Sequence, residues 1–174
     1  MHIRKTEKQE IPALLQMIRD SYIPYREQIR KEEIPSYTYD DIASLLDDPK
    51  SDVWTAEESG EITGMAAGTE LGPCAYHLKM LFVSGHSQHK GIGSALLERF
   101  ESRGAERHFS LFTTNYLAPA KWSRDFYRRH GYREYVPTDE ETSPDLKVQA
   151  DFLRGIGRLN NGHKHLLWKT IRTQ

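Results

Sequence analysis

The sequence Gln88-His89-Lys90-Gly91-Ile92-Gly93 joins a strand-like segment to a helical run. The first four N–H groups of a helix have no acceptor within the helix, and the helix dipole adds partial positive charge at the same end. The two glycines leave that end open to a ligand because they carry no Cβ. The lysine adds a positive charge, and the glutamine adds an amide donor. The stretch therefore predicts a binding site for an anion such as a pyrophosphate group.

Two other glycine-rich loops are excluded by the residues around these glycines. A dinucleotide fingerprint needs Gly or Ala where Leu96 stands, and an acidic residue about 20 positions further on. A Walker loop places its lysine after the glycines, whereas Lys90 precedes them. A plain helix start without a ligand is the alternative interpretation.

The pattern Gln-x-x-Gly-x-Gly, with Val83 upstream, resembles the coenzyme A signature of the GNAT N-acetyltransferase superfamily. A second segment, Phe126-Tyr127-Arg128-Arg129-His130-Gly131-Tyr132, is similar to the F-Y-x-x-x-G-F/Y helix end of that family. The resemblance implies a GNAT-type α/β (α+β) fold, with a mixed central sheet flanked by helices. It also implies acetyl-CoA as co-substrate and a primary amine of a small molecule or peptide as acceptor, which attacks the thioester directly.

The resemblance further implies roles for particular residues. Tyr127 would protonate the leaving thiolate, since a phenol with a pKa of about 10 stays protonated at neutral pH. His77 stands where several relatives place a base, and an imidazole pKa of about 6.5 suits that task. The expected cofactor-binding residues, of which Leu81 and Val83 would act through their backbone groups, are Leu81, Phe82, Val83, Gln88, His89, Lys90, Gly91, Ile92, Gly93, Ser94 and Asn115. Core packing of Tyr127 and a half-exposed surface strand for His77 are the alternatives.

The chain departs from the family pattern at three positions. Relatives often have Asn and Ala where Ala120 and Ser123 stand, so Asn115 is the substitute cofactor contact. Gly85 takes the place of a common proline. These departures keep a second function open, namely a non-catalytic acyl-CoA-binding or regulatory module with the same fold.

The composition predicts one globular domain over residues 1–174 in the cytoplasm. The hydrophobic share is 37%, the charged share is 28%, and no apolar run approaches the roughly 18 residues of a membrane span. A net charge of −1 argues against nucleic acid as a partner, and the lone Cys74 fits a reducing compartment. No metal site is expected, because His163 and His165 lack acidic or thiolate neighbours in sequence. The family resemblance also allows a homodimer.

Hydrophobic periodicity and turn residues predict the element order β-α-α-β-β-β-α-β-α-β-β. A hairpin is expected to close at Ser59-Gly60, and a helix is expected to begin after Thr38 with Asp41 as its capping partner. Gly104 is predicted to end the helix that follows the glycine motif. A strand is expected over residues 109–113. The next helix, over residues 119–130, is expected to bury Trp122 and Phe126.

Two regions of the sequence each allow more than one interpretation. An insertion at about residues 136–162, with a short helix in it, could cover the acceptor site, join a dimer interface, or be a loop without consequence. Four tyrosines interleaved with acidic residues could form a pocket wall for a cationic amine or a solvated surface, and these are Tyr22, Tyr25, Tyr37 and Tyr39.

Overall fold

The computed structural model describes residues 1–160 and 162–171, and its contacts divide the chain into two compact units. The first unit comprises Met1–Thr69 and Lys79–Phe100, and the second comprises Glu70–Leu78 and Glu101–Gln174. Asn161, within the predicted insertion, and residues 172–174 lie outside the described residues. The chain passes from one unit to the other near the end of strand β3 (Glu61–Leu71), within strand β4 (Ala75–Val83) and within helix α3 (Ile92–Glu106).

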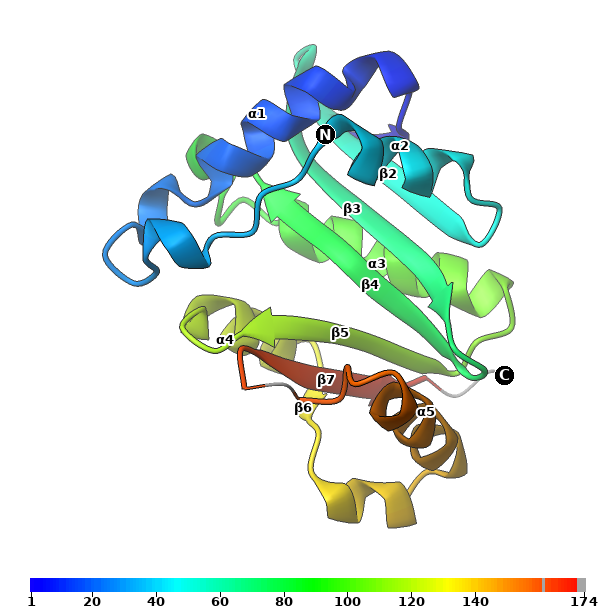
Figure 1. The fold of residues 1–174 in the computed structure, drawn as a ribbon. Coiled ribbons are helices and arrows are strands. Elements are labelled where there is room, and N and C mark those ends of the chain that lie inside the picture. The colour runs from blue at the N-terminus through cyan, green and yellow to red at the C-terminus, as the bar shows by residue number, and fades with distance from the viewer. Residues whose placement is uncertain (161, 172–174) are drawn as a thin grey trace. The chain divides into compact units, whose positions relative to one another are not determined.

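The first unit is built on an antiparallel sheet (Figure 1). Its strands are β1 (His2–Lys5), β2 (Ser51–Glu58), β3 (Glu61–Leu71) and the second half of β4. The turn between β2 and β3 has positive φ at both Ser59 (51°) and Gly60 (83°), as a two-residue hairpin requires. The hairpin prediction is therefore confirmed.

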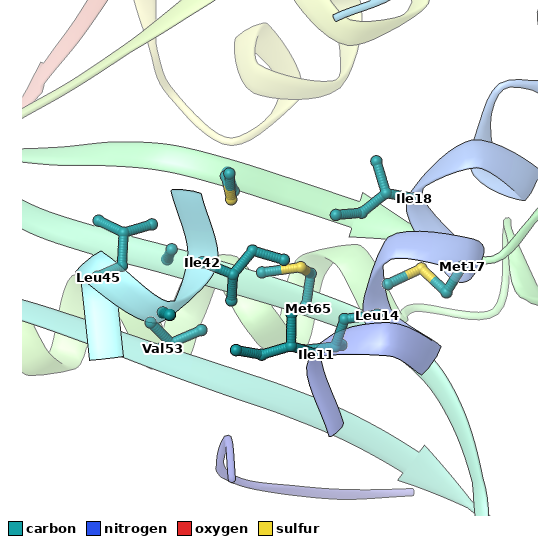
Figure 2. Close-up of a cluster of buried hydrophobic side chains, with 11 residues drawn as sticks. Ile11, Leu14, Met17, Ile18, Ile42, Leu45, Val53 and Met65 are labelled. Atoms are coloured by element: carbon teal, nitrogen blue, oxygen red, sulfur yellow. The ribbon is translucent and has the colours of Figure 1, made fainter. Parts of the chain in front are cut away.

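Two helices cover one face of this sheet and supply its core. They are α1 (Ile11–Ser21) and α2 (Tyr39–Asp47). Thr38 caps α2 by accepting a hydrogen bond from the Asp41 N–H, and Asp41 bonds back to the Thr38 N–H, which confirms the predicted capping pair. Figure 2 shows the side chains of both helices meeting those of β2 and β3, with Ile11, Leu14, Ile42 and Met65 fully buried.

The second unit contains a mixed sheet. The first half of β4 is parallel to β5 (Leu111–Leu117), β5 is antiparallel to β7 (Lys164–Thr170), and β7 is antiparallel to β6 (Arg133–Glu134). The end of α3, α4 (Lys121–Arg129) and α5 (Pro144–Gly155) complete the unit (Figure 1). Parallel and antiparallel pairing in one sheet with flanking helices confirms the predicted mixed α/β class.

Gly104 does not end α3, so that prediction is wrong. The helix continues to Glu106, and His108 follows it with a φ of 66°. A Cβ on Gly104 would lie 2.3 Å from Cε1 of Phe112 and 2.7 Å from Cδ1 of Tyr76. The glycine therefore serves close helix–sheet packing within the second unit. The next strand begins at Leu111, two residues after the predicted start.

The predicted insertion is part of the core of the second unit. Its helix α5 buries Leu146, Ala150 and Leu153 in a cluster with side chains from the strands, among them Leu111 and Trp168. The turn before α5 is fixed by the buried Asp139, which accepts a hydrogen bond from Nε1 of Trp168 at 3.0 Å. This packing gives the segment a structural role and excludes the interpretation of the insertion as a loop without consequence.

None of the helices in the described part of the chain combines the length and the apolar character needed to cross a bilayer.

Candidate functional site

The predicted anion site lies at the start of α3, in the first unit. A 3₁₀ turn (Gly85–Ser87) follows β4, and the first helical hydrogen bond of α3 runs from the Ala95 N–H to the Gly91 C=O at 3.0 Å. The N–H groups of Ile92 and Gly93 precede that bond, and helix geometry offers them no acceptor within the helix. His89 and Gly91 have positive φ, 62° and 83°, which turns the backbone of the loop sharply around Lys90.

The space above Gly91 is open to a ligand. A Cβ built on Gly91 would have no heavy atom within 4 Å, whereas a Cβ on Gly85 would lie 2.9 Å from the Asp20 C=O. The loop is therefore packed tightly at Gly85, where glycine replaces the expected proline, and is open where the helix begins. His89 and Lys90 are both exposed at this opening. The donor set, the positive charge and the free space fit a pyrophosphate group.

The side-chain amide of Gln88 stabilises this loop by hydrogen bonds. Its Nε2 donates hydrogen bonds to the Ser21 C=O at 2.9 Å and to the Val83 C=O at 3.1 Å. Both amide hydrogens are thus directed at carbonyl groups of the first unit, one at the end of α1 and one at the end of β4. These two hydrogen bonds give Gln88 a supporting position in the loop, and its direct contact with the anion stays a prediction.

The end of β4 carries an aromatic cluster in the first unit. Leu81, Phe82 and Val83 are half-buried, and the Phe82 ring packs against Tyr22 at 6.0 Å and against Tyr37 at 5.8 Å between centroids. Burial raises the pKa of the Tyr37 phenol, and the nearby Asp41 raises it further. Two of the four predicted wall tyrosines therefore pack on Phe82.

His77 is buried in the second unit, with only 8% of its surface exposed. The parallel pairing of β4 with β5 places it opposite Thr113, and its Nδ1 lies 2.9 Å from the Thr113 hydroxyl oxygen. The alternative of a half-exposed surface strand for His77 is wrong, because strands in the middle of a sheet with parallel pairing are covered on both faces. Thr113 carried no sequence signal, since the register between distant strands decides this contact.

Tyr127 is the buried aromatic residue of α4. It is 5% exposed, whereas Trp122 and Phe126, which were predicted to be buried, are half-exposed. The Tyr127 ring packs edge-on against Phe126, with centroids 5.1 Å apart, and against Tyr132 at 5.6 Å. The helix ends as predicted: the N–H of Tyr132 donates to the Tyr127 C=O, and Gly131 has a φ of 86°.

Two further predicted positions lie in the second unit. Asn115 is half-buried on β5, opposite Leu166 of β7. The imidazole of His165 stacks on the Tyr116 ring, with centroids 5.2 Å apart. Among residues 1–160 and 162–171, no group of three or more His, Cys, Asp or Glu side chains could hold a metal ion.

Comparison with known families identifies the class of protein. Residues 49–134 match the family model of the acetyltransferase (GNAT) domain, a span that includes both sequence motifs. The chain belongs to the GNAT acetyltransferase superfamily. No curated protein sequence matches this chain significantly.

Solved structures share the fold over nearly the whole chain. The PaiA N-acetyltransferase of Thermoplasma acidophilum, crystallised with coenzyme A, has a TM-score of 0.75 at 15% identity, covering 98% of both chains. A GNAT acetyltransferase of Staphylococcus aureus has a TM-score of 0.72 at 17% identity, covering 98% of this chain and 99% of its own. The ribosomal-protein-S18-alanine N-acetyltransferase of Escherichia coli has a TM-score of 0.69 at 14% identity, covering 99% and 95%. At these identities the likeness shows the GNAT fold.

Proposed function

We propose that the protein transfers the acetyl group of acetyl-CoA to a primary amine of a small molecule or peptide by direct attack in a ternary complex. The observation that carries the proposal is the start of α3, where the Ile92 and Gly93 N–H groups precede the first helical hydrogen bond beside an open Gly91. Coenzyme A in the crystals of the Thermoplasma acidophilum relative supports the cofactor. The Escherichia coli relative, named for acetylating an alanine of a ribosomal protein, supports an amine acceptor.

The proposed roles follow from the chemistry of each group. The N–H groups at the start of α3 and the Lys90 ammonium hold the pyrophosphate. The acceptor nitrogen bonds to the thioester carbon, the C–S bond breaks, and the sulfur takes the proton of the Tyr127 hydroxyl. His77 takes the proton that the amine releases, and Thr113 holds the imidazole by its Nδ1.

A thiol-release assay across a panel of amines and peptides tests the proposal. Release of coenzyme A that depends on one acceptor, with the acetylated product found by mass spectrometry, is the expected result. Tight acetyl-CoA binding without turnover on any acceptor would instead identify a non-catalytic acyl-CoA-binding module.

The cofactor site itself is tested by Gly91→Trp. We expect this variant to lose most of its affinity for acetyl-CoA, because the indole fills the space above the start of α3. Gly60→Trp is the matched control, since Gly60 also has a φ of 83° and a Cβ at that position would have no heavy atom within 4 Å. Both variants should lose about 1 kcal/mol of stability to left-handed strain. Equal acetyl-CoA affinity of the two folded variants, measured by calorimetry, would argue against the assignment.

His77→Gln tests the proposed base. The substitution keeps polar volume at a buried position and removes the imidazole, which is the proposed proton acceptor. We expect kcat/KM to fall most below the pKa of the acceptor amine, with acetyl-CoA affinity nearly unchanged. Thr113→Val, which removes only the partner of Nδ1, should give a smaller loss. A pH–rate profile of unchanged shape and height for His77→Gln would assign the proton to another acceptor.

A further inference from the structure

The cofactor loop, residues 84–91 between β4 and α3, packs against the end of α1 within the first unit. Nε2 of Gln88 donates a hydrogen bond to the Ser21 C=O at 2.9 Å, which joins positions 67 apart in the sequence. A Cβ on Gly85 would lie 2.9 Å from the Asp20 C=O. The loop backbone therefore approaches the end of α1 as closely as only a glycine permits.

The segment of residues 20–24 also carries Tyr22, one of the predicted wall tyrosines of the acceptor pocket. The Tyr22 ring packs on Phe82 at the end of β4, with centroids 6.0 Å apart. The N–H of Tyr25 donates to the Tyr22 C=O at 2.9 Å, so the chain beyond Tyr22 continues in a tight turn. Residues 20–24 therefore contact both the end of β4 and the loop that leads to the anion site.

The side-chain amide of Gln88 is held in one orientation. Nε2 donates to the Ser21 C=O and to the Val83 C=O, so a flipped amide would set its oxygen against both carbonyl oxygens. The amide oxygen, Oε1, is buried and has no hydrogen-bond partner among the described residues. A buried acceptor without a partner lowers stability, and such a group in a native protein points to a task besides folding.

We propose that Gln88 is a positioning residue that couples the cofactor loop to residues 20–24. Acetyl-CoA bound at the start of α3 holds the loop backbone between Gln88 and Gly91. The Gln88 amide then holds the Ser21 C=O, which fixes the segment that presents Tyr22 to the acceptor. Cofactor binding thereby orders one wall of the acceptor site, and by linkage a bound acceptor tightens acetyl-CoA binding by the same factor. This inference rests on the proposed function, because it needs acetyl-CoA at the start of α3.

Hydrogen exchange with and without coenzyme A tests the coupling and needs no acceptor. In the wild type, saturating coenzyme A should slow exchange of the Tyr22 and Tyr25 amides about 3- to 10-fold, the range that one hydrogen bond contributes. Both amides are hydrogen-bonded to nearby carbonyl groups, so their exchange reports the opening of the segment. Gln88→Met keeps the length of the side chain and removes both donors. We expect this variant to lose the slowing at both tyrosines and to keep it at Ile92 and Gly93.

Gln149→Met is the matched control. The amide of Gln149 also bonds to the backbone, since its Nε2 donates to the Leu71 C=O at 2.7 Å and its Oε1 accepts from the Cys74 N–H at 3.4 Å. Gln149 lies on α5 in the second unit, away from the cofactor loop in the chain. This variant should lose stability and keep the slowing that coenzyme A causes at Tyr22 and Tyr25.

Gly85→Ala tests the coupling without removing a hydrogen bond. The added Cβ would meet the Asp20 C=O at 2.9 Å and Cδ of Pro24 at 3.2 Å, so the loop has to move away from the segment. We expect this variant, too, to lose most of the slowing at Tyr22. Gly155→Ala is its control, because a Cβ there would have no heavy atom within 4 Å.

The outcomes of the exchange experiment separate this inference from the proposed function. No slowing at Tyr22 in the wild type, or equal slowing in the wild type and in folded Gln88→Met, would overturn the inference and leave the proposed acetyl transfer standing. A wild-type protein that does not bind coenzyme A would overturn both.

Steady-state kinetics with an identified acceptor give a second readout. Gln88→Met should raise the KM for the acceptor about 3- to 10-fold, because the cost of ordering residues 20–24 then falls on acceptor binding. The kcat should stay near the wild-type value, since the lost interaction serves substrate and transition state alike. An unchanged acceptor KM in Gln88→Met, or a fall in kcat alone, would overturn the inference.

Discussion

Replacing Tyr127 with phenylalanine is expected to lower kcat by about 10²-fold while acetyl-CoA affinity stays near the wild-type value. General acid catalysis contributes about 10²- to 10⁴-fold, and the low end applies because a thiolate is a fair leaving group. The change removes one oxygen and keeps the ring that packs against Phe126 and Tyr132. Single-turnover kinetics, in which the chemical step limits the rate, provide the measurement.

The kinetics of Tyr127→Phe can be interpreted only if the variant keeps its stability. Because Tyr127 is 5% exposed, a loss of activity has meaning only if the Tm of Tyr127→Phe stays within a few degrees of the wild type. Tyr135→Phe shows how much the loss of a buried, hydrogen-bonded hydroxyl disturbs the same unit. A Tyr127→Phe protein with wild-type single-turnover rate would leave Tyr127 with a packing role alone.

The parts of the fold that local chemistry decides could be predicted from the sequence. The Thr38–Asp41 capping pair, the Ser59-Gly60 hairpin and the Gly131 helix end each depend on residues within a few positions of one another. The open helix start at Gly91 belongs to the same group, because it needs only a strand, a short loop and a helix in that order.

Contacts between residues far apart in the sequence explain the features that the sequence analysis left open or predicted wrongly. Gly104 was predicted to end the helix because glycine is common at helix ends. In the structure, Phe112 and Tyr76 occupy the volume that a side chain at this position would need. The burial of His77 follows from the pairing of β4 with β5, which lie far apart in sequence.

The helix of the insertion was also predictable only in part. Its apolar positions predicted a short helix, and α5 confirms this. The surface that the helix covers was not predictable, because it is formed by strands that precede and follow the insertion. The buried face of α5 packs against Leu111 of β5 and against Leu166 and Trp168 of β7. The insertion therefore completes a sheet face that would otherwise expose these side chains to water.

Leu146→Ala is expected to destabilise the protein by about 2–5 kcal/mol, the largest loss of stability among these variants. Leu146 is 0% exposed and lies in the cluster that joins α5 to β5 and β7. Truncating it removes apolar burial and leaves a cavity that the close-packed strands fill only in part. Urea unfolding at 25 °C, followed by tryptophan fluorescence because Trp168 lies in the same cluster, measures the change.

Val148→Ala, two residues further along the same helix, is the control for this effect. Val148 is 47% exposed, so its truncation should change the free energy of unfolding by no more than about 0.5 kcal/mol. A large difference between the two variants is expected if α5 seals the core of the second unit, because helix propensity alone would affect both positions by similar small amounts. Losses of equal and small size at Leu146 and Val148 would mean that α5 detaches from the strands at little cost. The insertion would then have to be explained by binding, as a cover for the acceptor or as a dimer contact.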